Sequence, residues 1–484
     1  MNLRQKAVKG VVWSAIQSWG TQAIAFIVFF VLARLLEPEA FGLVALAGVF
    51  LAFIQIFIDQ GLSTAIVQRQ ELEPEHLDTA FWTNLGISLL LTLFGIAAAG
   101  VVAELFKEPQ LAPILRWLSL SFLFIGLNGV QQAIFERQLA FKALAVRSLV
   151  AVVAGGVVGV VMAFLGFGVW SLVGKQLVNG LVGVLALWGA SDWRPGFKVS
   201  IKHFRELFSF GINLVGIRIL SFLSTRGDDF LIGYFLGSVA LGYYTVAYRL
   251  LQILNELLVT VINKTAIPVF SRIQEEPERL RQALYTATEL CSFVACPVFL
   301  GISVLAPELI IVIFGEQWIP SIPVMQILML IGLLYALFYF TDAVIMSVGK
   351  SSWSLGVNVV ATVANLVAFM LVVRWGIVAV AAAYVIRGYL MSPIRLWLTR
   401  KLIHIDLITY FRKFASPLTA SMVMVFTLLV AKHFLERMMS LPILLAIYIV
   451  IGIIIYSVTI LIIAPSLTRR VIDLSSLGIG KFKI

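Results

Sequence analysis

The feature that most constrains this sequence is a series of long apolar runs that recurs from one end of the chain to the other. A helix needs roughly 20 predominantly apolar residues to cross the hydrocarbon core of a bilayer. The chain has 484 residues, of which 61% are hydrophobic and only 13% are charged, and its mean hydropathy is +1.00. We therefore expect an all-α polytopic membrane protein.

The apolar runs predict about fourteen transmembrane helices. Several of the runs are longer than a bilayer requires, so we expect tilted, bent or protruding helices among them. The predicted spans are residues 11–33, 41–66, 80–105, 112–134, 144–165, 168–189, 207–236, 240–265, 284–313, 322–346, 354–373, 376–398, 411–433 and 441–464.

Basic residues are distributed unequally between the two ends of these spans. With the N-terminus in the cytoplasm, 25 of the 36 Lys and Arg residues fall on the cytoplasmic side, six on the other side, and five within spans. The positive-inside rule then predicts that both termini are cytoplasmic. The same distribution accounts for the net charge of +11 without nucleic-acid binding. The first apolar run is too long for a signal peptide, so we expect it to stay in the membrane.

The chain also repeats short patterns at equivalent points. Identities at four places, in the same order, predict duplication of a six-helix unit, and an even number of helices gives both copies the same orientation. We expect a first lobe at 1–190, a linker at 191–206, a second lobe at 207–400, and two additional helices with a tail at 401–484. The matching residues are Leu36, Ala40 and Gly42 with Leu236, Ala240 and Gly242; Phe106 and Glu108 with Phe314 and Glu316; Pro113 with Pro323; and Gly168 with Gly376.

The seventh span carries charges at membrane depth, where each costs at least about 2.5 kcal/mol on insertion scales. Arg218, Thr225 and Asp229 share one helical face with Ser221. We expect this polar stripe to line a charged cavity between two halves of a transporter. For Arg226 and Asp228 the alternative is a structural role, with Arg226 pairing locally with Asp229.

The eighth span carries a second polar stripe, which includes Arg249, Gln252 and Glu256. We expect Arg249 and Glu256 to line the cavity, because buried charges need water or a partner. The uncharged members, Gln252, Thr260 and Asn263, are more typical of hydrogen bonding between helices.

Four other charged residues lie in predicted spans. Asp59 is either functional or simply near the outer end of the second span, and Lys175 either faces the cavity or extends to the membrane surface. Asp342 and Arg387 form either a mutual ion pair or separate parts of the cavity lining.

A cavity lined by Arg218, Arg249, Lys175, Arg226 and Arg387 would favour an anionic substrate, because the planar arginine fork binds two phosphate oxygens at once. The acidic residues Asp229, Glu256, Asp59 and Asp342 could carry a proton or another cation for coupling. We expect no cofactor, metal site or ATP site. A disulfide between the two cysteines, Cys291 and Cys296, is not expected because they point to different sides of one helix.

Several segments resemble a known family. The run Asp-Phe-Leu-Ile-Gly-Tyr-Phe-Leu-Gly that begins at Asp229, followed by Leu-Gly-Tyr-Tyr from Leu241, resembles the signature of bacterial polysaccharide transporters of the MOP flippase superfamily. The segments that begin at Val31 and Asp59 resemble the WzxC-like branch of that family.

This resemblance implies a flippase in the bacterial cytoplasmic membrane for oligosaccharides carried on undecaprenyl pyrophosphate. It implies two lobes around a cationic cavity that opens to each side in turn, driven by a proton, a sodium ion or the membrane potential, and association with a polymerase and a chain-length regulator. Related peptidoglycan-precursor flippases use arginines of spans 1, 2 and 8. Arg249 could take the last role, whereas spans 1 and 2 have no arginine in their cores, so span 7 would substitute. The two additional helices would shape a groove for the lipid tail.

Two other classes of function are weighed against this one. A multidrug exporter of the MATE type would carry organic cations, for which an acidic cavity is expected rather than the arginines found here. A membrane enzyme such as a polymerase would need a sizeable outer loop with catalytic residues, and the predicted outer loops are short.

Overall fold

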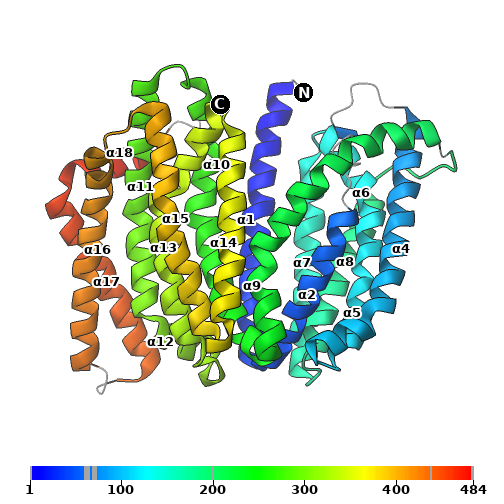
Figure 1. Ribbon diagram of the computed structural model, residues 1–484, viewed down its shortest axis with the longest axis horizontal. Helices are drawn as coiled ribbons and strands as arrows, with labels where there is room; N and C mark the ends of the chain where they lie inside the picture. Colours follow the sequence, from blue (N-terminus) through cyan, green and yellow to red (C-terminus); the bar gives the residue numbers. More distant parts are fainter. Residues whose placement is uncertain (1–2, 59–65, 68–72, 199, 436–438, 481–484) are drawn as a thin grey trace. The chain divides into compact units, whose positions relative to one another are not determined.

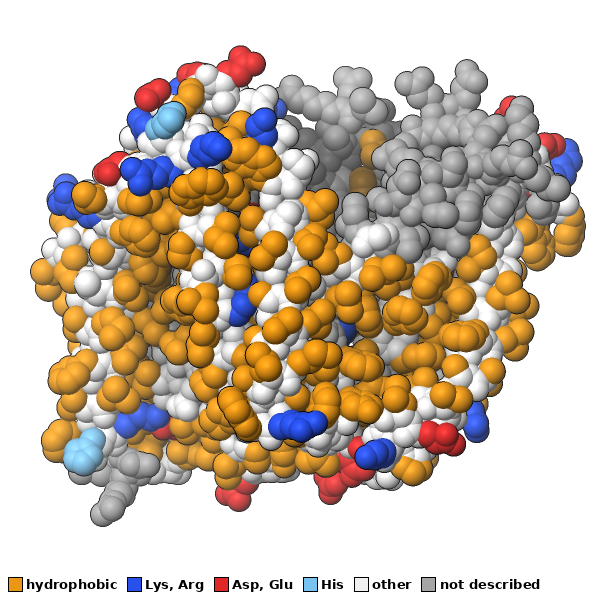
Figure 2. Space-filling view, in the orientation of Figure 1, with side chains coloured by type: hydrophobic (Ala, Val, Ile, Leu, Met, Phe, Trp, Pro, Cys, Tyr) orange, Lys and Arg blue, Asp and Glu red, His pale blue; other side chains and the backbone are white. Residues whose placement is uncertain are grey.

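The computed structural model describes residues 3–58, 66–67, 73–198, 200–435 and 439–480. Within these ranges the elements are helical, and 13 helices are long and apolar enough to cross a membrane. Apolar side chains cover most of the face seen in Figure 2 between the helix ends, while charged ones gather toward the ends. The prediction of an all-α polytopic membrane protein is confirmed; the number of spans and the repeat layout stay predictions.

The chain divides into two compact units, residues Met1–Thr245 and Val246–Ile484. This division falls inside the second predicted lobe, so the lobe boundaries drawn from the sequence stay predictions. The helices of the first unit are α1 (Leu3–Leu35), α2 (Pro38–Ile58), α4 (Pro74–Phe106), α5 (Leu111–Ser119), α6 (Ser121–Arg137), α7 (Phe141–Phe164), α8 (Trp170–Ala190) and most of α9 (Ile201–Asn255) (Figure 1).

The second unit continues from the end of α9. Its helices include a π-helical turn (Glu256–Thr260), α10 (Val261–Arg272), α11 (Pro277–Val304), α12 (Ala306–Leu309), a second π-helical turn (Ile310–Phe314), a 3₁₀ turn (Glu316–Trp318) and α13 (Ser321–Ser347). They continue with α14 (Ser351–Val372), a 3₁₀ turn (Val373–Trp375), α15 (Ile377–Ile403), α16 (Leu407–Leu435), α17 (Leu441–Ile463) and α18 (Pro465–Gly480). In this unit α13 packs against α11 and α15, and α16 packs against α11 and α17.

The structure adds detail that the apolar runs do not contain. The predicted fourth span is divided at Leu120 between α5 and α6, and α18 occupies part of what we expected to be a tail. Hydropathy overlooks α18 because the helix is short and carries Arg469 and Arg470. Arg470 contacts the buried carboxylate of Glu289 at 3.3 Å, and Lys413 contacts the same group at 3.1 Å.

The helix α9 is not continuous. Gly237 has φ 83° and ψ 179°, values that break the helix and that a residue with a Cβ rarely adopts. The N–H of Ser238, which follows the break, donates to Glu108 Oε1 at 3.0 Å. A carboxylate at the start of the second helical segment is favourable because that end of a helix carries partial positive charge.

Just beyond this break, α9 crosses the start of α2 with the two backbones in contact. A Cβ on Gly42 would lie 1.7 Å from the carbonyl oxygen of Ser238, and a Cβ on Gly242 would lie 2.0 Å from that of Pro38. The two contacts are reciprocal, because each glycine faces a backbone carbonyl of the other segment.

We predict that Gly42→Ala destabilises the protein by about 3 kcal/mol or more, because the new methyl group meets backbone atoms that cannot rotate away. The matched control is Gly48→Ala in the same helix, where a Cβ meets nothing within 4 Å and alanine favours the helix. Thermal unfolding of the purified variants in detergent measures the difference. Equal melting temperatures would contradict the observed crossing.

An aspartate stabilises the start of α16. The Oδ2 atom of Asp406 accepts the N–H of Thr409 at 2.9 Å and also its hydroxyl, and Oδ1 accepts the N–H of Ile408 at 3.4 Å. The hydroxyl of Thr409 is the largest influence that lowers the pKa of Asp406 from its ordinary value of 3.8. A carboxylate in this position satisfies N–H groups that the first helical turn leaves unpaired.

We predict that the stabilisation from Asp406 is pH-dependent. Because the pKa is lower in the folded state, the contribution is complete above the unfolded pKa and disappears as pH falls through the folded pKa. The melting temperature of wild type should therefore exceed that of Asp406→Ala at neutral pH and approach it in strong acid. A difference that does not change with pH would exclude a role for the ionised carboxylate.

Candidate functional site

The acidic pair on α9 is anchored within the first unit. Asp229 accepts a hydrogen bond from Arg226 at 3.0 Å, and its side chain is only 9% exposed. The hydroxyl of Tyr244 donates to Asp228 Oδ2 at 2.8 Å, while the N–H of Asp229 donates to Oδ1 at 3.0 Å. The local pairing of Arg226 with Asp229 is thus confirmed. Asp228 links the two segments of α9 across the break at Gly237.

The rest of the predicted stripe on α9 has a more open environment. Ser221 and Thr225 are exposed, and Arg218 is half-buried. The hydroxyl of Thr225 donates to the carbonyl oxygen of Ser221 at 2.8 Å, so its hydrogen-bonding need is met by its own helix. The polar face therefore changes from exposed at Ser221 and Thr225 to buried at Asp229.

The second stripe follows the C-terminal end of α9. Arg249 is half-buried, and its Nη1 atom donates to Gln252 Oε1 at 3.4 Å. Glu256, also half-buried, opens the π-helical turn. Such turns within α-helices are frequent at functional sites. The side chains of Thr260 and Asn263 lie outside the described residues.

Arg387 lies in a polar cluster between α13, α14 and α15. Its Nε atom donates to Asn365 Oδ1 at 2.7 Å, and its guanidinium lies 5.3 Å from the ring centre of Tyr384. The hydroxyls of Tyr384 and Tyr335 are 2.8 Å apart and hydrogen-bonded, and the ring of Tyr248 lies 6.1 Å from that of Tyr384. Arg387 and the three tyrosines are half-buried.

The predicted alternative of an ion pair between Asp342 and Arg387 is wrong. Asp342 instead binds Arg395, whose Nη1 atom lies 2.6 Å from Oδ2, and Nη2 of Arg395 donates to Asn358 at 2.9 Å. Arg395 lies eight residues beyond Arg387, more than two helical turns along α15. The register of α13 against α15 thus brings Asp342 level with the later arginine.

The remaining predicted residues are not brought into these clusters. Lys175 is half-buried in α8, where α7 approaches closely: a Cβ on Gly159 would lie 2.8 Å from the Cβ of Lys175. Asp59 lies outside the described residues. Among the residues that the structure covers, no group of three or more His, Cys, Asp or Glu side chains could hold a metal ion.

Sequence reasoning missed Arg395, Asn358 and Asn365 as members of the polar clusters. Arg395 lies near the predicted cytoplasmic end of the span 376–398, a position where a basic residue is expected whether or not it has a partner. A signal was present for the two asparagines, because residues seven apart lie on one face of a helix.

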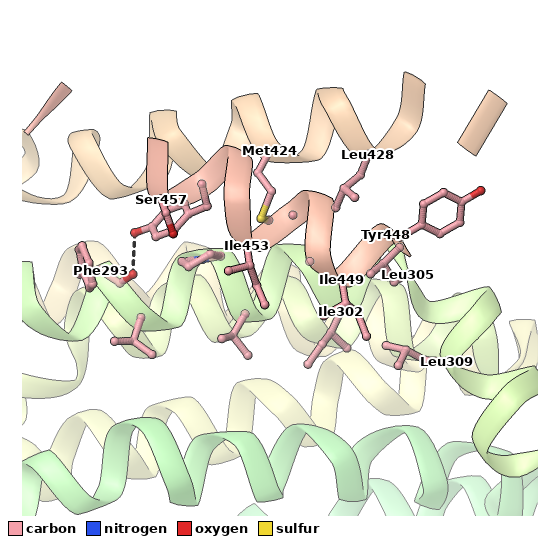
Figure 3. Close-up of a pocket in the computed structure, with 16 residues that line it drawn as sticks. Phe293, Ile302, Leu305, Leu309, Met424, Leu428, Tyr448, Ile449, Ile453 and Ser457 are labelled. Carbon is pink, nitrogen blue, oxygen red and sulfur yellow. Dashed lines mark hydrogen bonds between the residues drawn. The ribbon is translucent and has the colours of Figure 1, made fainter. Parts of the chain in front are cut away.

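An apolar groove crosses α11, α16 and α17 in the second unit (Figure 3). Its cavity volume is about 470 Å³, and its walls include Ile302, Met424 and Ile453. The hydroxyl of Tyr456 donates to the carbonyl oxygen of Phe293 at 2.6 Å, so α17 is hydrogen-bonded to α11 along the groove. The walls present hydrocarbon with few polar atoms.

Residues 31–323 match the family described as polysaccharide biosynthesis protein, over more than half of the chain. The chain belongs to this family. The resemblance predicted from the segment that begins at Asp229 is therefore confirmed. This member of the polysaccharide biosynthesis family is a multi-pass membrane protein.

Several curated proteins are similar to this family member. It is 32% identical over 66% of its length to the succinoglycan biosynthesis transport protein ExoT of Rhizobium meliloti, and that alignment spans 65% of ExoT, slightly under two thirds. It is 29% identical over 69% of its length to the lipopolysaccharide biosynthesis protein WzxC of Escherichia coli, of which 68% is covered. It is 24% identical over 87% of its length to the teichuronic acid biosynthesis protein TuaB of Bacillus subtilis, of which 88% is covered.

Two solved structures share the fold of this polysaccharide biosynthesis family member. The lipid II flippase MurJ, in an inward closed conformation, matches 95% of the chain and 100% of its own, with TM-score 0.76 and 16% identity. An inward-facing multidrug resistance transporter of the MATE family and MOP superfamily matches 82% of the chain and 98% of its own, with TM-score 0.59 and 19% identity. At these identities the similarity concerns the fold.

We predict that Tyr244→Phe destabilises the protein by about 1–3 kcal/mol, because it removes a hydrogen bond from the buried carboxylate of Asp228. The control is Tyr234→Phe in the same helix, where the side chain is 45% exposed and little change is expected. Thermal unfolding in detergent compares the two variants. If both melt as wild type does, Asp228 does not tie the segments of α9 together.

Proposed function

We propose that this protein is a flippase that moves undecaprenyl-pyrophosphate-linked oligosaccharide from the cytoplasmic to the outer leaflet for O-antigen, capsule or exopolysaccharide assembly. The observation that carries the proposal is the placement of arginines within membrane-spanning helices of a polysaccharide biosynthesis family member. Charges at this depth are costly and normally serve a pathway through the membrane. The relatives named as a transport protein and a flippase support a transport protein rather than an enzyme.

The pyrophosphate is assigned to Arg218 and Arg249. Both are half-buried, and their guanidinium groups can each bind two oxygens of one phosphate. Arg226 differs because it is paired with Asp229 at 3.0 Å. Arg387, held by Asn365 and Tyr384, and Lys175 in α8 would contribute positive potential or contacts to the oligosaccharide.

The polyprenyl tail is assigned to the groove of α11, α16 and α17. Its hydrocarbon walls and volume of about 470 Å³ suit part of a long apolar chain. The pyrophosphate and oligosaccharide then bind one surface, and the polyprenyl tail binds another. Alternating access moves the polar part across the membrane while the tail stays in lipid. This division follows the role that the family resemblance implies for the two additional helices.

Coupling is assigned to the acidic residues of the spans, with a proton or sodium ion as the driving ion. Asp342 is the strongest candidate because its salt bridge to Arg395 joins α13 to α15, and protonation would remove the charge that holds the two helices. Asp229, Glu256 and Asp59 complete the proposed set. Both termini are assigned to the cytoplasm and the protein to the bacterial inner membrane, in association with a polymerase and a chain-length regulator.

We predict that Arg218→Ala and Arg249→Ala each reduce surface polysaccharide in cells by about 10-fold or more, because each removes a charge-assisted contact to phosphate worth about 1.5–3 kcal/mol. Lysine at either position should restore part of the activity, since it keeps the charge but loses the fork. Immunoblots of surface polysaccharide and of protein level provide the measurement.

The control is Arg116→Ala, an exposed arginine in the last turn of α5, which should leave the polymer unchanged. Normal polymer in both cavity variants at normal protein level would refute the assignment of the pyrophosphate. A change in dye resistance with intact surface polysaccharide would instead favour an organic-cation exporter.

A further inference from the structure

A second apolar groove lies between α14 and α15, and its lining includes none of the residues assigned to flipping. Its volume is about 420 Å³, within the range of ligand pockets. Val360, Met391 and Ile394 line it along its length, and Trp353, Trp397 and Lys401 line it as well. At Gly356, also in the lining, a Cβ would meet nothing within 4 Å, so this part of the groove is open.

Two lysines and two tryptophans gather at one end of the groove. The Nζ atom of Lys401 lies 5.5 Å from the ring centre of Trp353 and 5.7 Å from that of Trp397. The Nζ atom of Lys350 lies 6.0 Å from the ring of Trp353. Both ammonium groups therefore lie near the same indole ring, that of Trp353.

These lysines lie where their helices end. Lys350 directly precedes α14, and Lys401 is in the last turn of α15. Both are exposed, and within the described part of the chain neither forms a salt bridge with a carboxylate. Tryptophans at this level are typical of the membrane–water interface, and the distribution of basic residues predicts that this end faces the cytoplasm.

We propose that this groove binds an anionic phospholipid of the cytoplasmic leaflet, with its phosphate on Lys350 and Lys401 and an acyl chain along the groove. The positive charges complement the phosphate, and the apolar walls complement the chain. Basic pockets between membrane helices on the cytoplasmic side suit such lipids. Because this occupant contacts no residue assigned to flipping, the proposal is independent of the proposed function.

The test measures lipid binding to the purified full-length protein in mild detergent by native mass spectrometry. The probes are phosphatidylglycerol, phosphatidylcholine with the same acyl chains, and undecaprenyl phosphate. The charge variant is K350Q/K401Q, with Lys142→Gln as its control, because Lys142 also lies over a tryptophan, 5.8 Å from the ring of Trp13. The groove variant is Gly356→Leu, with Gly86→Leu as its control, since Gly86 is also exposed and open.

We expect wild type to bind phosphatidylglycerol in preference to phosphatidylcholine. The charge variant should weaken that binding by roughly 30-fold, from the contribution of two lysines near the membrane surface. Gly356→Leu should weaken binding of both phospholipids at this site by filling the groove. Both controls should bind as wild type does, with the same elution volume and helical content.

Three results would overturn the proposal. Equal binding of the two phospholipids by wild type would remove the role of the lysines. Unchanged phosphatidylglycerol binding by Gly356→Leu would place the lipid elsewhere. The third result is that an equal amount of undecaprenyl phosphate displaces phosphatidylglycerol from wild type but not from Gly356→Leu. The groove would then be a site for the carrier lipid instead.

Discussion

The first unit depends on a contact between two backbones that only glycine permits. At Gly42 and Gly242 the chains approach so closely that any side chain would overlap a carbonyl group. The break at Gly237 precedes this crossing, and it frees an N–H group that Glu108 binds. Asp228 and Tyr244 then join the two parts of α9 by a buried hydrogen bond. The glycine contact, the helix break and the polar groups that hold it thus lie together in the first unit.

Charged groups within the spans fall into two kinds. Asp228 and Asp229 are buried and bound to neighbours of their own helix, Tyr244 and Arg226. Arg218, Arg249 and Arg387 are only partly buried. Desolvating a charge is costly, so partial exposure lowers the cost of placing these arginines within the spans. Burial therefore separates the two aspartates from these arginines.

Hydropathy predicted most helices of this chain because the bilayer requires long apolar segments, and it predicted the pairing of Arg226 with Asp229 because that contact lies within one helical turn. Contacts between helices depend on register, which one sequence does not contain. Asp342 could have met Arg387 or Arg395, and only packing of α13 on α15 decides between them. The helix α18 was not predicted for another reason. It is short and polar, so its ordering depends on tertiary contacts such as that of Arg470 with Glu289.

The crossing of α2 and α9 has a consequence for how such a sequence can diverge. The missing side chain at each glycine leaves room for a backbone carbonyl of the other segment. Positions 42 and 242 therefore constrain each other, although most of the first unit separates them in the sequence. A change tolerated at either position would require the facing carbonyl to move, and that carbonyl belongs to the other segment. Descendants of this chain should therefore keep both positions small together or rebuild both together.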